Sequence, residues 1–220
     1  MIVSPQELRS RISTDEFDYR TIMSVLGEYS RPRDRITRLL AQGVILQIRR
    51  GLYIFAEPFA RLPLSRELLA NLIHGPSYLS MESALVYHAM IPEHTVAVTS
   101  ASLGRDRRFE TAAGSFTYRR IPGRVFSIGV ERAEIPGRRS FLVARPEKAL
   151  ADMVHVDRGL ELRSFMAVEA YLFDSLRIDP AAIDALDGSL LNEIACAYNT
   201  GRTGRLAAFL TRSLPGSAPV

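Results

Sequence analysis

Residues 30–55, SRPRDRITRLLAQGVILQIRRGLYIF, contain a change of hydrophobic period that decides the fold of the N-terminal region. Before Gly43, apolar residues recur at the spacing of a helix face, at Ile36, Leu39 and Leu40. Gly43 itself suits the left-handed conformation that ends many helices. After it, the apolar residues alternate as they do in strands. The stretch therefore predicts a helix followed by two strands, joined by a tight turn at Arg49, Arg50 and Gly51.

The predicted helix has one apolar face and one charged face. Ser30 is expected to cap it, and Pro32 to lie in its first turn, where a missing N–H costs nothing. These limits give a helix of about 11 residues, or roughly 16 Å. The polar residues opposite or beside the apolar face are Arg31, Arg33, Asp34, Arg35, Thr37 and Arg38. One face is therefore expected to pack into a core, and the other to meet solvent or a ligand.

Two further helices are predicted upstream of this stretch. Residues 4–12, SPQELRSRI, begin with a serine cap and a proline at the first helical position. Residues 18–29, DYRTIMSVLGEY, place Ile22, Val25 and Leu26 on one face. The order helix, helix, turn, helix, hairpin is that of a winged helix-turn-helix. Residues 1–60 are therefore predicted to form a DNA-binding domain of this kind.

In this architecture the third helix enters the major groove, whose width of about 12 Å admits a helix. Arg31 and Arg38 could each pair with guanine O6 and N7, and Asp34 could accept from cytosine N4. Arg49 and Arg50, at the hairpin tip, would hold phosphates or reach the minor groove. Asp34 could instead form an i,i+4 pair with Arg38 on a solvated helix.

Two other interpretations of this region stay open. A small cap of helices and a hairpin could carry the same charges only for solvation, and some winged helices form protein-interaction modules that do not read DNA. The helix cap, turn glycine, exposed arginines and basic hairpin tip occur in the order that DNA binding requires. Their coincidence favours DNA binding over both alternatives.

The remainder of the chain, residues 61–220, is predicted to form a larger α+β domain. Two helical segments come first, over 62–75 and 77–93, the second after a short extended entry and with Ser80 as its cap. The centre, about 95–145, is rich in strand-like runs separated by glycine and proline turns. Helical patterns return over 146–214. The predicted fold class is therefore α+β, a winged helix-turn-helix followed by an α+β domain with a helical C-terminal end.

Charge is distributed unevenly along the chain. Residues 101–145 hold ten arginines against four acidic residues, whereas residues 151–220 hold six basic and nine acidic residues. The central arginines that stand out by their clustering are Arg105, Arg107, Arg108, Arg119 and Arg120. They could contact phosphates, meet an acidic partner, or line a solvated sheet edge that discourages aggregation. Because alternation along a strand puts neighbours such as Arg107 and Arg108 on opposite faces, the sequence alone does not choose among these.

Composition restricts the class of protein. The chain has 220 residues, 47% of them hydrophobic and 24% charged, with a net charge of +4, which is typical of a folded globular protein. The single cysteine, Cys196, excludes an internal disulfide, suits a reducing cytosol and is expected to be a buried thiol. No signal peptide or long apolar run is evident, so a cytoplasmic protein without membrane contact is expected.

Motifs of catalysis and metal binding are missing from the sequence. It has four histidines but no HExxH, no CxxC pair, no GxSxG and no glycine-rich phosphate loop. Glu147 and Lys148 are expected to be ordinary first-turn helix residues, and Asp152 and His155 an ordinary i,i+3 pair. We therefore expect no enzyme, no catalytic residues, no metal and no cofactor.

Several segments together resemble one protein family. They are residues 17–55, YLSMESALVYHAMIPE (78–93), VTSAS (98–102), RRFETAAGSFTYRRIP (107–122) and FLVARPEKALADMVH (141–155). This series is similar to the abortive-infection type IV antitoxins, AbiEi, over about residues 17–155. The part after residue 77 is the more specific, because many regulators share the first part.

The resemblance implies a DNA-binding repressor that is also an antitoxin. In that family the N-terminal winged helix binds inverted repeats in the promoter of its own operon, and the C-terminal domain counteracts a co-encoded, nucleotidyltransferase-like toxin. By position, the residues that contact double-stranded DNA would be Arg31, Arg33, Asp34, Arg35, Thr37 and Arg38 of the helix, with Arg49 and Arg50 of the wing. The resemblance assigns no individual residue to the antitoxin role.

Overall fold

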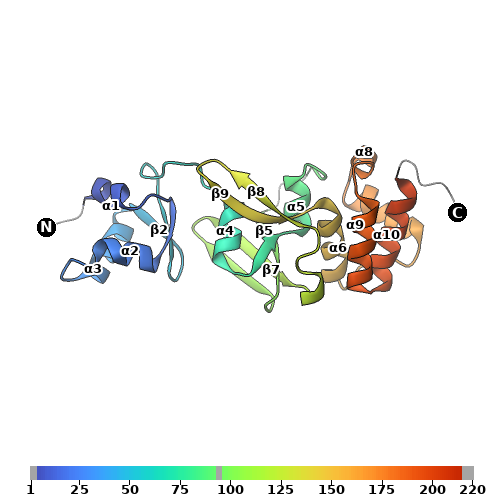
Figure 1. Cartoon of the computed structure of the whole chain (residues 1–220), viewed down its shortest axis with the longest axis horizontal. Coiled ribbons are helices and arrows are strands. Elements are labelled where there is room, and N and C mark those ends of the chain that lie inside the picture. The colour runs from blue at the N-terminus through green and yellow to red at the C-terminus, as the bar shows by residue number, and fades with distance from the viewer. Residues whose placement is uncertain (1–3, 93–95, 215–220) are drawn as a thin grey trace.

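The computed structural model describes residues 4–92 and 96–214. It contains helices and two sheets, of three and six strands, which confirms the predicted α+β class. Figure 1 shows the small sheet with its helices at one end, the larger sheet in the middle and a group of helices at the other end. Residue 95, where the sequence places the start of the β-rich centre, lies outside the described residues.

The N-terminal part, residues 4–60, consists of three helices and the three-stranded sheet. Its elements are α1 (Pro5–Arg11), β1 (Glu16–Asp18), α2 (Tyr19–Leu26), α3 (Pro32–Ala41), β2 (Ile45–Arg49) and β3 (Leu52–Phe55). The sheet has the order β1-β3-β2, and both strand pairs are antiparallel. The helices and the β2–β3 hairpin lie where the sequence predicts them. Strand β1 is not predicted, because three residues are too few to show a period and only pairing with β3 defines them.

α3 differs from its prediction at the first turn. The expectation that Ser30 caps the helix is wrong, since Arg31 occupies the cap position and no side chain caps the helix. Pro32 has no N–H, so one fewer donor in the first turn needs a partner. At the other end Gly43 has a φ of 65°, which is the left-handed conformation predicted for it.

α2 and α3 pack their apolar faces into a small core. The buried residues of these two helices are Ile22, Val25, Leu26, Ile36 and Leu39. Leu40, predicted for the same face, is half-buried. Phe17, Tyr53 and Phe55 of the sheet belong to the same hydrophobic cluster. This packing fixes the rotation of α3, so its polar face must point outward.

The C-terminal part is built on the six-stranded sheet, whose order is β6-β7-β5-β4-β9-β8. The strands are β4 (Ser77–Leu79), β5 (Ala97–Ser102), β6 (Arg107–Thr111), β7 (Gly114–Arg120), β8 (Val130–Ile135) and β9 (Arg139–Ala144). The helices are α4 (Arg66–Ile73), α5 (Met81–Tyr87), η1 (Gly123–Val125), α6 (Pro146–Val156), α7 (Phe165–Glu169), η2 (Ala170–Ser175), α8 (Pro180–Ile183), α9 (Gly188–Tyr198) and α10 (Gly201–Ser213). α4 packs on β4 and β9, α5 packs on β5 and α6, and α9 and α10 pack on each other and on α6.

Most of the predicted helices and strands of this part are confirmed, with three differences. The short helix α8 is not predicted. Ser80 holds the cap position of α5 but makes no capping bond, because its hydroxyl donates to the Asp152 carboxylate at 2.7 Å. Cys196, predicted to be buried, is exposed on α9. Among the described residues, no helix has the length and apolar character needed to cross a membrane.

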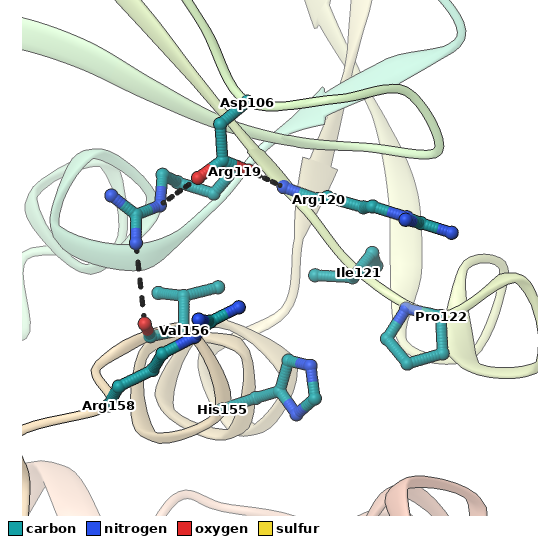
Figure 2. Close-up of a pocket in the computed structure, with 8 residues that line it drawn as sticks. All are labelled: Asp106, Arg119, Arg120, Ile121, Pro122, His155, Val156 and Arg158. Atoms are coloured by element: carbon teal, nitrogen blue, oxygen red, sulfur yellow. Dashed lines mark hydrogen bonds and ion pairs between the residues drawn. The ribbon is translucent and has the colours of Figure 1, made fainter.

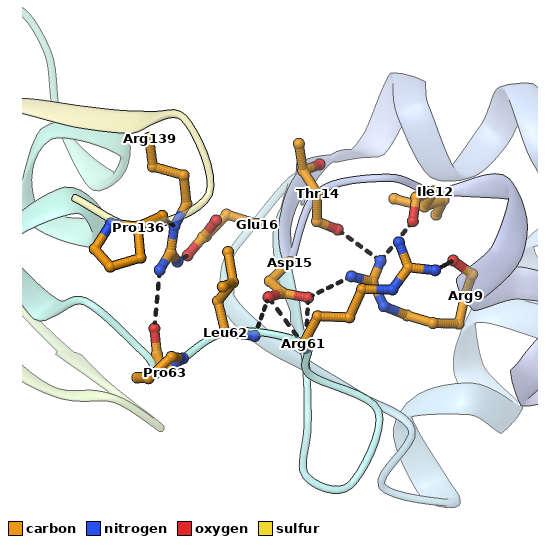
Figure 3. Close-up of polar contacts among 10 residues, drawn as sticks. All are labelled: Arg9, Ile12, Thr14, Asp15, Glu16, Arg61, Leu62, Pro63, Pro136 and Arg139. Atoms are coloured by element: carbon orange, nitrogen blue, oxygen red, sulfur yellow. Dashed lines mark hydrogen bonds and ion pairs between the residues drawn. The ribbon is translucent and has the colours of Figure 1, made fainter. Parts of the chain in front are cut away.

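The two parts are joined by buried polar contacts as well as by the chain (Figure 3). The Asp15 carboxylate accepts from Arg9 Nη2 at 2.7 Å and from the backbone N–H of Leu62 at 2.8 Å. Glu16 Oε1, in β1, lies 2.7 Å from Arg139 Nη1 at the start of β9, and their side chains are only 6% and 10% exposed. β1 of the small sheet therefore contacts β9 of the larger sheet.

Candidate nucleic-acid interface

The polar face of α3 is exposed, as its prediction requires. The exposed residues of the helix and its cap are Arg31, Arg33, Asp34, Thr37 and Arg38. Neither Asp34 nor Arg38 has an ion-pair partner among the described residues, so the i,i+4 pair is not formed. Their charged groups are therefore free to contact a ligand.

Arg35 lies on the flank of α3 and has a different environment. It is half-buried, and its guanidinium carbon lies 4.1 Å from the centre of the Tyr29 ring. Such stacking of a cation on an aromatic face stabilises both groups. Arg35 thus contributes to packing between the α2–α3 turn and α3. This role differs from the DNA contact that the sequence predicts for it.

A groove of about 570 Å³ separates α3 from the β2–β3 turn. Its lining residues are Tyr19, Arg33, Ile36, Thr37, Leu40, Arg50, Gly51 and Tyr53. Arg33 borders the groove from the helix and Arg50 from the turn, so one hollow has a cation on each side. Thr37, which also borders it, donates its hydroxyl to the Arg33 carbonyl at 3.2 Å.

Arg49 lies beside the turn but faces the C-terminal part. Its Nη2 donates to the carbonyl of Leu72, at the end of α4, at 3.5 Å. Burial is the main cause that lowers the pKa of His74, and the charges of Arg107 and Arg49 lower it further. The charges of Arg49, in the hairpin, and Arg107, in β6, therefore both act on His74.

The five central arginines do not form one surface. Arg105, Arg107 and Arg108 are exposed in and before β6, which is an edge strand. Arg107 lies opposite Tyr118 of β7, whose hydroxyl donates to the Ala70 carbonyl of α4 at 2.6 Å. Because side chains alternate along a strand, Arg108, which pairs with Thr117, and Arg119 lie on the other face of the sheet.

Arg119 and Arg120 instead border a second hollow, of about 590 Å³ (Figure 2). Arg119 Nη2 donates to the Val156 carbonyl, at the end of α6, at 3.3 Å. The sequence does not show that Arg119 and Arg120 meet the end of α6, because that contact is a tertiary property.

A buried ionic cluster in α6 is the feature that the sequence misses. Lys148 Nζ lies 2.7 Å from Asp152 Oδ1, and both side chains are 0% exposed. The hydroxyls of Tyr78 and Ser80 donate to Asp152 Oδ2 at 2.8 and 2.7 Å, and the Tyr198 hydroxyl donates to Oδ1. Glu147 and Lys148 do lie in the first turn, as predicted, but both are buried.

The electrostatics of this cluster follow from its burial. Burial lowers the pKa of the Lys148 ammonium, while the Asp152 carboxylate opposes that shift. Burial and the Asp152 charge raise the pKa of Tyr78 and Tyr198 well above the usual range, so both hydroxyls keep their protons and donate. Lys148 is the only lysine of the chain, and its place four residues before Asp152 in an apolar helix was the available signal.

Metal binding has no support in the part of the chain that the structure describes, where no group of three or more histidine, cysteine or acidic side chains could hold an ion. Scans of the sequence against protein-family models and against curated proteins give no match. The resemblance of residues 17–155 to the AbiEi antitoxins therefore stays a prediction.

Proposed function

We propose that the protein is a sequence-specific, double-stranded DNA-binding repressor whose N-terminal part works as a winged helix-turn-helix. The observation that carries this proposal is the groove between α3 and the β2–β3 turn, which Arg33 and Arg50 border from different elements. DNA-binding folds of this type place a helix in the major groove and hold the adjacent backbone from flanking elements. An exposed helix beside a concave basic surface suits both tasks.

Different residues are proposed to read bases and to hold phosphates, according to their position. Arg31, Asp34 and Arg38 are exposed and lack ion-pair partners among the described residues, so they are available to read base edges. Arg33 and Arg50 border the groove and would hold phosphates. Buried Ile36 and Leu39 keep α3 in the orientation that presents these groups.

The biological role within this proposal is regulation of the protein's own promoter, which carries inverted repeats, and neutralisation of a co-encoded nucleotidyltransferase-like toxin. The resemblance of residues 17–155 to AbiEi antitoxins supports both halves of that role. The exposed polar face of α3 adds independent support to the first half alone. Co-expression with the neighbouring gene tests the second half, since an antitoxin restores growth that the toxin arrests.

The experiment that tests DNA binding compares two duplexes, the protein's own upstream promoter DNA and a scrambled sequence of equal length, across a salt series. A specific repressor is expected to prefer the promoter by about 10³-fold or more. Its affinity should fall with salt in proportion to the number of phosphates that it contacts. Equal binding to both duplexes, or none, would reject sequence-specific recognition and favour a protein-interaction module.

A further inference from the structure

A second basic pocket lies in the C-terminal part, between the end of β7, η1 and the end of α6 (Figure 2). Its volume of about 590 Å³ is within the range of roughly 300–1,000 Å³ that small-molecule sites occupy. α6 lies beyond the larger sheet from α3, toward the opposite end of the molecule (Figure 1). The pocket is therefore separate from the surface proposed to bind the operator.

Cations dominate the lining of this pocket. Arg119, Arg120 and Arg158 border it, and Asp106 is the one acidic residue among its lining groups. The Asp106 carboxylate is already engaged, with Oδ2 3.3 Å from Arg119 Nε and Oδ1 accepting from the Arg120 N–H at 2.8 Å. This contact holds Arg119 in place and leaves the other two guanidinium groups unneutralised.

Arg120 and Arg158 are the groups available to a ligand. Both side chains are exposed, and among the described residues neither has a hydrogen-bond or ion-pair partner. They come from different elements, Arg120 from the end of β7 and Arg158 from the segment after α6. Guanidinium groups bind phosphate oxygens through parallel N–H bonds, so each of these two groups suits a phosphate oxygen. Figure 2 draws them on different sides of the pocket, so an exposed side chain must turn for both to reach one phosphate.

The remaining wall of the pocket is apolar and aromatic. Ile121 and Pro122 face the pocket from one side, and the half-buried His155 ring from the other (Figure 2). The His155 ring is held in place by the Tyr198 ring, with 4.6 Å between their centres. A wall of this kind accommodates a planar ring beside the phosphate-binding groups.

We propose that this pocket binds a phosphorylated small molecule of mononucleotide size. Arg120 and Arg158 hold the phosphate, Arg119 adds a fixed positive charge, and the ring of the ligand packs between Pro122 and His155. This site goes beyond the proposed DNA binding, because it requires neither α3 nor the hairpin. Its occupant would be a free nucleotide rather than the operator.

The test is isothermal titration calorimetry of the full chain with AMP, GMP, CMP and UMP, each beside its unphosphorylated nucleoside. At least one mononucleotide is expected to bind. Its nucleoside is expected to bind at least about tenfold more weakly. The Arg120→Ala/Arg158→Ala double variant is expected to weaken that binding by about tenfold or more, because it removes both phosphate contacts. Neither side chain has a partner in the described fold, so the variant should remain folded.

The matched control is Arg132→Ala, which removes an arginine of β8 that is 64% exposed and, within residues 4–92 and 96–214, pairs only with Glu134, at 3.9 Å. It should bind the mononucleotide as the wild type does. Absence of binding by all four mononucleotides at millimolar concentration, or equal loss in the control, would overturn the proposal. Competitive displacement of the nucleotide by promoter duplex would also overturn it, since the phosphate site would then belong to DNA. Variants of Arg38 report on operator binding separately, so the two proposals fail independently.

Discussion

α3 and α6 have similar N-terminal sequences but lie in different environments, one exposed and one buried. Each starts at a proline, Pro32 or Pro146, that follows an arginine at the cap position, and neither has a side-chain capping bond. They have similar lengths, 10 and 11 residues. Yet α3 leaves most of its charged residues in solvent, whereas α6 buries Lys148 and Asp152 completely.

The difference lies in what surrounds each helix. α3 lies at the end of the molecule and covers only a small core, so its charges keep their hydration and stay available to a ligand (Figure 1). α6 is packed among α5, α9, α10 and β9, where a lone charge would cost several kcal/mol. Its charges are tolerated only because they pair with each other and with tyrosine and serine hydroxyls. Charge in a helix therefore indicates a binding face only when the packing leaves it exposed.

The largest expected effect comes from breaking the buried pair. Asp152→Ala should lower the free energy of unfolding by about 3–5 kcal/mol, because it leaves the Lys148 ammonium buried without its partner. Asp34→Ala, on the exposed face of α3, is the matched control. It should cost less than about 1 kcal/mol, since only a favourable interaction with the helix dipole is lost. Urea unfolding measures both; equal losses would contradict the contrast between the two helices.

The next effect concerns the reading of bases by α3. Arg38→Ala should weaken promoter binding by about 1–3 kcal/mol and relax the preference for one base position, while the fold stays intact. Electrophoretic mobility shifts with the promoter and with single-base variants of it measure this. Arg163→Ala, which removes an exposed arginine in the C-terminal part, should leave the affinity unchanged. An Arg38→Ala protein that binds every sequence as well as the wild type does would exclude α3 as the reading helix.

A smaller effect on stability is expected at acid pH, and it arises from His155 in α6. Burial is the main cause that lowers the pKa of His155, with the charges of Arg202, Lys148 and Arg124 adding to it and Asp152 opposing. The unfolded chain, whose histidine pKa is about 6.5, then takes up protons before the folded protein does. Stability is therefore full above that pKa and falls as the pH drops below it.

His155→Gln removes this contribution and should reduce the fall in Tm between pH 7.5 and pH 5.5, while the wild type shows the full decrease. His74, whose pKa is also lowered, remains in both proteins and sets the residual acid sensitivity. Differential scanning calorimetry at the two pH values measures this difference. An identical fall in Tm in both proteins would show that His155 does not contribute to acid sensitivity.

The sequence predicts the N-terminal helices and hairpin well because their signals are local. Gly43 and Gly51 both adopt positive φ, at 65° and 84°, where the pattern places a helix end and a turn. The polar face of α3 follows in the same way from the spacing of Ile36 and Leu39. What the sequence lacks is information that depends on distant segments.

Three misses show this dependence. Strand β1 exists only through its pairing with β3, and Arg119 and Arg120 meet the end of α6 only in the folded chain. The burial of Lys148 depends on Tyr78 and Tyr198, which lie 70 and 50 residues away along the chain. The spacing of Lys148 and Asp152 in an apolar helix indicates a pair, but no local pattern indicates the two tyrosines that complete the cluster.

The most direct test of DNA binding by the groove beside α3 compares this groove with the pocket near α6, on promoter DNA across a salt series. Arg33→Ala/Arg50→Ala removes the two cations of the groove, and Arg120→Ala/Arg158→Ala removes two cations of the pocket. The first double variant is expected to reduce the slope of log affinity against log salt by about 1.8, since each phosphate contact contributes about 0.9. The second should leave promoter affinity and slope unchanged. A slope that the groove variant does not alter, or an equal reduction by the pocket variant, would contradict the assignment of the groove beside α3 to DNA.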